Sequence, residues 1–223
     1  RGLGDVYKRQ TENRSTGILR NSINRQNTYG LISKLNYDLS DALKLQLGLD
    51  WRTAGIEHAR EVRDLLGGDY YVDFADDGYD PDGDGNSDPK IVRLGDKIAY
   101  SNVTTVDWLG FFGQASYSAG ALSAYGMAGW SQIAYTYQDS FTVAQTVVDH
   151  GDPITATQLK AGAMYDLSDD LSLFANFGLV EKPPILDNVI YYDGTVASDP
   201  ANEQFSSLEA VSYTHLRAHE TRR

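Results

Sequence analysis

Apolar and polar residues alternate strictly along two neighbouring segments in the first quarter of the chain. From Tyr29 to Leu39 every second residue is apolar or small, and the residues between them are mostly polar. After a short break the pattern resumes from Leu43 to Trp51, where the intervening residues run from Lys44 to Arg52. Successive side chains of a strand point to opposite faces, so this pattern predicts two strands with one apolar and one polar face.

The same period of two predicts further strands along the chain. Asp107–Tyr117 alternates with two exceptions, Trp108 and Phe112, which fall on the polar side. The segment 122–137 is strand-like but its alternation is ambiguous. The remaining predicted strands are 159–167, 171–179 and a seventh that begins near Phe205. Runs of about ten residues are longer than the usual five or six of a soluble sandwich strand, and they match a tilted strand that crosses a bilayer.

The connections between these strands alternate between short and long. Short turns are expected near 39–42, 119–121 and 168–170, and long loops near 53–103, 138–156 and 182–203. A tyrosine precedes each short turn on the apolar face, at Tyr37, Tyr117 and Tyr165. Outer-membrane barrels have this asymmetry of loops, and aromatic girdles at the membrane interface. Within the first long loop, the spacing of Val62, Leu65 and Leu66 predicts a short helix over His58–Leu66.

One hairpin sequence occurs twice. The segment from Tyr37 to Leu45 closely matches the segment from Tyr165 to Leu173, and both span a strand, a Ser-Asp turn and a second strand. Serine and aspartate suit tight turns because their side chains bond the nearby backbone. The repeat therefore indicates a hairpin module that is reused around one sheet.

Composition narrows the class of protein. The chain has 223 residues, no cysteine and a net charge of −12, and it has no run of eighteen apolar residues. Disulfides, thiolate metal sites and a membrane-spanning helix are thereby excluded, and the acidity argues against nucleic acid as a partner. No nucleophile–base–acid set and no phosphate loop is recognisable, so we do not expect an enzyme.

Both ends of the chain resemble translated sequencing adapter. Back-translation of residues 1–10 resembles a transposon adapter used in sequencing libraries, and residues 211–221 resemble its reverse complement. We therefore expect residues 1–10 and 211–223 to be adapter-derived and not natural, and residues 11–210 to be a partial barrel domain.

A candidate calcium loop lies in the first long connection. Acidic or amide residues stand at alternate positions around Gly85, as in the first nine positions of a calcium-binding loop. The candidate ligands are Asp80, Asp82, Asp84, Asn86 and Asp88. The glutamate expected at the twelfth position is replaced by Ile91, so an acid such as Asp76 or Asp77 would have to complete the site. The alternative is a solvated acidic loop.

Tyrosines in the long loops are candidate contacts for a solute. They are Tyr70, Tyr71, Tyr79, Tyr191 and Tyr192. The alternative is that these are loop tyrosines without a binding role, which are common.

Three segments of the chain resemble one protein family. Residues 24–37, NRQNTYGLISKLNY, look like a barrel strand of TonB-dependent receptors from Bacteroidetes-type bacteria. LFANFG at 173–178, followed by EKPPILDN at 181–188, is similar to a strand and loop near the end of such barrels. NEQFSSLE at 202–209 resembles the start of the next strand.

This resemblance implies an all-β, antiparallel transmembrane barrel fragment, with about seven strands of a barrel of twenty-two. It also implies an outer membrane of a Gram-negative bacterium, lipid around the barrel, an N-terminal plug, and the TonB complex as partner. The expected function is import of a scarce nutrient: a siderophore, cobalamin or an oligosaccharide. The alternatives are another outer-membrane barrel, such as a porin or channel, and a soluble calcium-stiffened all-β binding protein. A fragment with both sheet edges unpaired is expected to aggregate in isolation.

Overall fold

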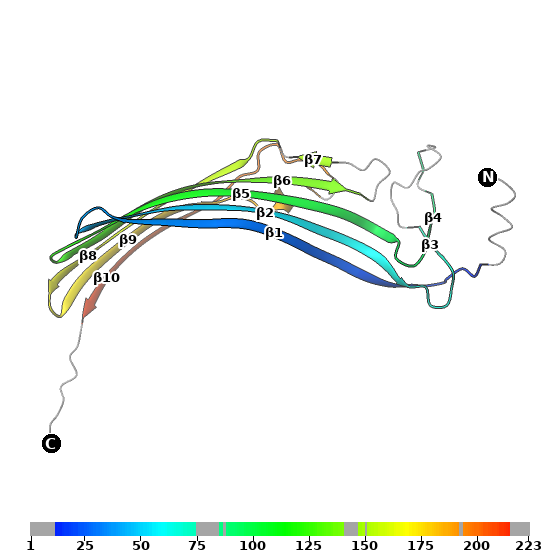
Figure 1. Cartoon of the computed structure of the whole chain (residues 1–223), viewed down its shortest axis with the longest axis horizontal. Coiled ribbons are helices and arrows are strands. Elements are labelled where there is room, and N and C mark those ends of the chain that lie inside the picture. The colour runs from blue at the N-terminus through cyan, green and yellow to red at the C-terminus, as the bar shows by residue number, and fades with distance from the viewer. Residues whose placement is uncertain are drawn as a thin grey trace, which may run out of the picture.

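Long antiparallel strands make up most of the structure (Figure 1). The computed structural model describes residues 12–74, 85–86, 88–140, 147–149, 151–191 and 194–214. The long strands are β1 (Leu19–Asp38), β2 (Leu43–Asp64), β5 (Lys97–Ala119), β6 (Leu122–Asp139), β8 (Ile154–Ser168), β9 (Leu171–Lys182) and β10 (Glu203–Thr214). They lie side by side in that order in one curved sheet, so each is hydrogen-bonded to the next long strand along the chain.

The smaller elements lie in the long connections. They are β3 (Tyr71–Asp73), β4 (Lys90–Val92), β7 (Val147–Asp149) and the 3-10 helix η1 (Leu186–Asn188). β3 and β4 form a separate two-stranded sheet, whereas β7 adds to the main sheet by pairing with β6. Within the described residues, no helix is long and apolar enough to span a membrane.

The seven predicted strands are confirmed, and several are longer than the sequence suggested. β1, β2 and β5 contain 20, 22 and 23 residues. A tilted strand needs about 9–11 residues to cross a bilayer. These strands therefore continue well past the length that a membrane requires, and the extra residues lie at the end with the long loops.

The short turns form as predicted, and serine side chains stabilise two of them. Ser40 Oγ accepts a hydrogen bond from the Leu43 amide at 3.1 Å, and Ser168 Oγ accepts one from the Asp170 amide at 3.4 Å. The third turn uses Gly120, whose φ of 57° is a conformation that side chains disfavour. The repeated Tyr-Asp-Leu-Ser sequence thus marks two equivalent hairpins.

The predicted helix over His58–Leu66 is wrong, because β2 runs through this segment to Asp64. Pairing with β1 and β5 on both sides satisfies its backbone, and this outweighs the local helical spacing. Val62 and Leu65 are buried all the same, in a small cluster with Val92 and Ile98 above the end of the sheet. The loop predicted for 53–103 therefore shrinks to the residues between β2 and β5.

The short-turn half of the described sheet has large apolar side chains that none of the described residues covers. Leu35 is 61% exposed and Leu47 is 57% exposed, although both lie in well-paired strands, near the short turn that joins β1 and β2. The two buried apolar clusters lie instead at the long-loop end of the sheet. A sheet with this distribution requires an apolar environment other than its own chain.

Candidate membrane face and lumen site

Register places the apolar residues of all neighbouring strands on one face. Residues directly opposite each other in an antiparallel pair share a face. One row across the sheet consists of Leu35, Leu47, Gly113, Ala128, Leu159 and Leu179. Leu122–Asp139, whose alternation was ambiguous, is thereby resolved: its even-numbered residues from Leu122 to Trp130 lie on this outer face.

The apolar belt crosses the sheet diagonally. Tyr37 pairs with Leu45, and Leu45 pairs with Ala115, so Tyr37 and Ala115 lie at the same level in the sheet. Tyr117 therefore lies two residues nearer the short turns than Tyr37 does. Tyr117 is in turn level with Ala163, so Tyr165 lies two residues nearer the short turns than Tyr117 does. Two residues span about 6.8 Å along a strand and two strand spacings about 9.6 Å, which gives a slope of about 35°. Strands of membrane barrels tilt by this amount, so the three tyrosines form a level girdle in a tilted barrel.

A second set of aromatic residues marks the opposite edge of the belt. Trp51, Phe111 and Trp130 lie on the outer face, and the Phe111 and Trp130 rings stack with centroids 6.3 Å apart. Aromatic side chains at both edges of an apolar band are typical of the two interfaces of a bilayer.

Beyond this edge the same outer face becomes charged. Arg25 pairs with Glu57 at 3.3 Å, and Lys97 pairs with Glu61 at 3.2 Å. The hydrogen bond from Lys97 lowers the pKa of Glu61, which lies past the bilayer part of β2. Such a ladder of partly exposed ion pairs belongs in water, so the strand ends project from the membrane on the long-loop side.

The inner face of the sheet is polar but has aromatic rings that lie flat on glycine. A Cβ on Gly48 would overlap the Phe112 ring, and a Cβ on Gly162 would press on the Tyr125 ring. Tyr125 Oη also donates a hydrogen bond to Asn176 Oδ1 at 2.7 Å, which fixes its ring across β8. Trp108 and Phe112, the two apolar exceptions of the alternation, thus face the lumen as predicted.

The loop between β9 and β10 folds inward over this face. Val189 and Ile190 are 0% and 3% exposed, and they pack against Ile133 and Tyr135 of β6. Tyr135 Oη donates a hydrogen bond to the Pro184 carbonyl at 3.0 Å. The loop is thereby fixed to the inner wall at the long-loop end.

Comparison with known proteins agrees with this geometry. Residues 2–214 match the family model described as "TonB dependent receptor-like, beta-barrel". No curated protein and no solved structure matches the chain.

The chain belongs to the TonB-dependent receptor β-barrel family. It is part of the barrel of a transporter in the outer membrane of a Gram-negative bacterium, and not an enzyme. Members of this family work with TonB and import a ligand. The exposed belt of the receptor is therefore the surface that meets lipid, and the opposite face of the sheet is the inner wall of the barrel.

The predicted adapter flanks are not resolved by these findings. Residues 1–10 lie outside the described part of the receptor. Residues 211–214 continue β10 in register with β9, and the family match includes them. An adapter origin for either flank stays a prediction.

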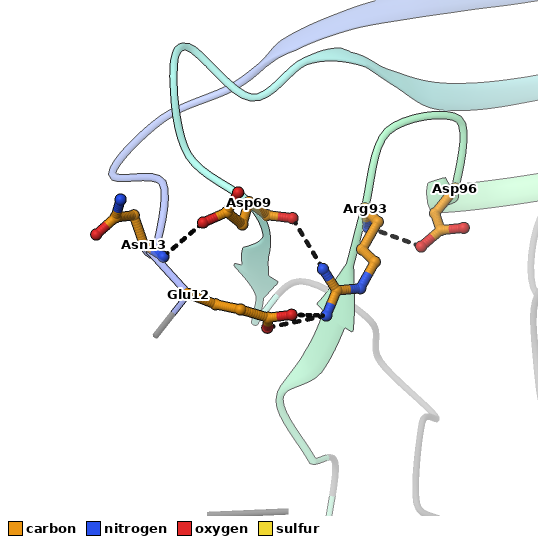
Figure 2. A network of polar contacts seen from close by, with 5 residues as sticks. All are labelled: Glu12, Asn13, Asp69, Arg93 and Asp96. Atoms are coloured by element: carbon orange, nitrogen blue, oxygen red, sulfur yellow. Dashed lines mark hydrogen bonds and ion pairs between the residues drawn. The ribbon is translucent and has the colours of Figure 1, made fainter. Parts of the chain in front are cut away.

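A polar network holds the loops next to β1 together (Figure 2). The Arg93 guanidinium contacts both carboxylate oxygens of Glu12 at 2.9 Å and donates to the Asp69 carbonyl at 3.1 Å. Asp69 Oδ2 accepts a hydrogen bond from the Asn13 amide, and Asp96 Oδ2 accepts one from the Arg93 amide. The segment before β1 is thus joined to both ends of the loop between β2 and β5.

The five candidate tyrosines do not form one site in the described residues. Tyr71 packs against the Val62 cluster, and the Tyr70 carbonyl accepts a hydrogen bond from the Ser15 amide. Tyr191, in contrast, is 49% exposed on the inward-folded loop. Tyr79 and Tyr192 lie outside the described residues. Sequence reasoning missed the inward fold of this loop, which buries Val189 and Ile190 next to Tyr191 against the inner wall.

Most of the candidate calcium loop lies outside the described residues. Asp80, Asp82 and Asp84 are among the residues not described, whereas Asn86 and Asp88 are described. Gly85 has a φ of 86°, as a sharp turn requires. In the described ranges there is no group of three or more acidic or histidine side chains that could hold a metal. Calcium binding therefore stays a prediction.

Proposed function

We propose that this barrel segment belongs to a receptor that imports a scarce nutrient through a plugged barrel of twenty-two strands. The solute classes are a siderophore, cobalamin or an oligosaccharide, and the energy comes through TonB. The family match over residues 2–214 is the observation that carries this proposal. The resemblance of residues 24–37 further supports a Bacteroidetes-type source.

We further infer that the solute contacts the inward-folded loop before it reaches the plug. Tyr191 is exposed on this loop, while Val189 and Ile190 beside it are buried against β6. An exposed aromatic ring on a fixed support is a suitable first contact for a captured solute. Tyr192 is adjacent in sequence and belongs to the same proposal, whereas Tyr70, Tyr71 and Tyr79 in the first long loop are separate candidate contacts for the solute.

The experiment is uptake by cells that carry the whole receptor, in the presence and absence of TonB. Radiolabelled ferric siderophore, cobalamin and a labelled oligosaccharide are the three probes. One of them is expected to accumulate only when both the receptor and TonB are present. Accumulation that is equal without TonB would indicate a passive porin or channel and would overturn the import proposal.

Calcium in the 80–88 loop would act as a structural ion in this receptor. Carboxylates at alternate positions suit Ca²⁺, and the ion would stiffen a long acidic loop between β2 and β5. The test compares protease cleavage of this loop with Ca²⁺ and with EDTA, in the unmodified receptor and in a D82N/D84N variant. Ca²⁺ is expected to protect only the unmodified loop, and D187N on η1 is the control. Equal cleavage in all samples would leave the solvated acidic loop as the correct reading.

A further inference from the structure

A hollow of about 460 Å³ lies on the inner wall, across the part of the sheet next to the inward-folded loop. Its inward-facing lining includes Lys34, Asp50, Arg52, Trp108, Phe112 and Gln158. Trp108 also packs in the apolar cluster that holds the loop, so the hollow is continuous with the base of the loop. A volume of this size and a mixed aromatic and polar lining are typical of small-molecule sites.

Two glycines flatten the floor of this hollow. Lys34, Gly48, Phe112, Gly129 and Gln158 form one row across five strands of the inner wall. The Phe112 ring lies over Gly48, and the Gln158 side chain lies over Gly129. The ring therefore presents one face to the wall and the other to the lumen, where a planar or apolar part of a solute can pack on it.

The charges around the hollow leave one cation without a carboxylate. Arg52 binds both carboxylate oxygens of Asp50, at 2.8 and 2.7 Å. The Glu181 carboxylate accepts hydrogen bonds from the Thr157 amide and hydroxyl at 2.9 and 2.7 Å, but both side chains lie on the outer face of the sheet, on the other side from the inward-facing lining. Lys34 forms no ion pair or hydrogen bond with any of the described residues.

We propose that this hollow is a solute site for a molecule that carries a ring and an anionic oxygen group, such as a carboxylate, phosphate or phenolate. Lys34 attracts the anionic group and the exposed face of Phe112 supports the ring. Lys34 and Phe112 stand two strand spacings apart, about 10 Å, which the flexible lysine side chain can span. The site deepens the proposed import function, on which it rests, by naming the chemistry of the solute.

Salicylate and salicylamide are suitable probes because they share a ring and differ in charge. Saturation-transfer NMR would measure their binding to the whole receptor in lipid nanodiscs, with empty nanodiscs as the baseline. Salicylate is expected to bind more tightly than salicylamide. Lys34→Met should weaken salicylate binding roughly fivefold, as loss of one solvent-exposed ion pair would. Phe112→Leu should weaken the binding of both probes.

Lys44→Met is the matched control, because Lys44 lies on the same inner face but does not line the hollow. It should bind salicylate as the unmodified receptor does, and the heat-dependent gel shift of a folded barrel should be kept in all variants. Equal binding of the two probes, equal effects of K34M and K44M, or no salicylate binding with the plug in place would each overturn the site. TonB is absent from this measurement, so such a failure leaves TonB-driven uptake untouched, and a failure of uptake leaves salicylate binding untouched.

Discussion

Individual glycines on the inner wall serve packing and not turns. Gly48 and Gly162 lie within long strands, and each leaves room for an aromatic ring from a neighbouring strand. A glycine inside a strand normally weakens it, since it loses more conformational entropy and provides no side chain to pack. The aromatic rings that cover these glycines restore part of the lost stability, because they bury the bare backbone.

Gly48→Ala should destabilise the receptor, because the new methyl group would overlap the Phe112 ring. Overpacking of this kind typically costs about 1–3 kcal/mol. The measurement is the midpoint of denaturant unfolding in detergent. Gly55→Ala on the same strand is the control, since a Cβ there meets nothing within 4 Å. If both substitutions shifted the midpoint equally, the packing of the Phe112 ring on Gly48 would be wrong.

The sequence predicted the face of these residues but not their neighbours. Alternation alone placed Phe112 on the lumen side, and the structure confirms it. That Phe112 lies over Gly48 depends on the register between β2 and β5, which are separated by a long loop. Local periodicity contains no information on which residue of one strand opposes which residue of another.

At the level of elements, the sequence located all seven long strands and misjudged where some of them end. The bilayer part of β2 alternates cleanly, whereas the part beyond Thr53 has charges and small residues on both faces. Water can solvate either face there, so the apolar period disappears although the backbone remains paired. The short helix over His58–Leu66 was predicted for this reason.

The inward fold of the loop between β9 and β10 also could not be predicted. Val189 and Ile190 carry no periodic pattern, and the residues that they pack against, Ile133 and Tyr135, lie on another hairpin. Burial of these side chains against the wall, and not any local preference, determines the position of the loop. Tyr191 is the candidate for the first solute contact only because of this tertiary contact.

Tyr135→Phe should loosen this loop, because it leaves the buried Pro184 carbonyl without the phenol that donates to it. The loss of such a hydrogen bond costs about 1–3 kcal/mol. Hydrogen exchange of residues 184–197 is expected to become faster, while exchange in β1 and β2 stays the same. Tyr71→Phe, in the separate cluster near Val62, should leave the loop unchanged. Slow exchange in the Tyr135 variant would show that apolar packing alone fixes the loop.

At the scale of the whole molecule, the apolar belt connects alternation with membrane insertion. Each strand alone shows only that one face is apolar, which a soluble sandwich would also satisfy. Register adds that the belt moves by about one residue per strand, so it becomes level only if the strands tilt. A closed barrel imposes that tilt, and a sandwich has no reason for two aromatic edges that follow it.

This reasoning predicts that the cost of a charge on the outer face depends on its depth. Leu47 lies near the middle of the belt, whereas Thr105 lies on the same face beyond the aromatic edge. Leu47→Arg should destabilise the folded receptor in lipid by about 2–4 kcal/mol, and Thr105→Arg by at most about 1 kcal/mol. Denaturant titrations in liposomes would measure both, and a spin label at Leu47 should be accessible to oxygen dissolved in the lipid. Equal costs at the two positions, or a label accessible mainly to aqueous nickel complexes, would show that this face meets water and would remove the membrane assignment on which the transport proposal depends.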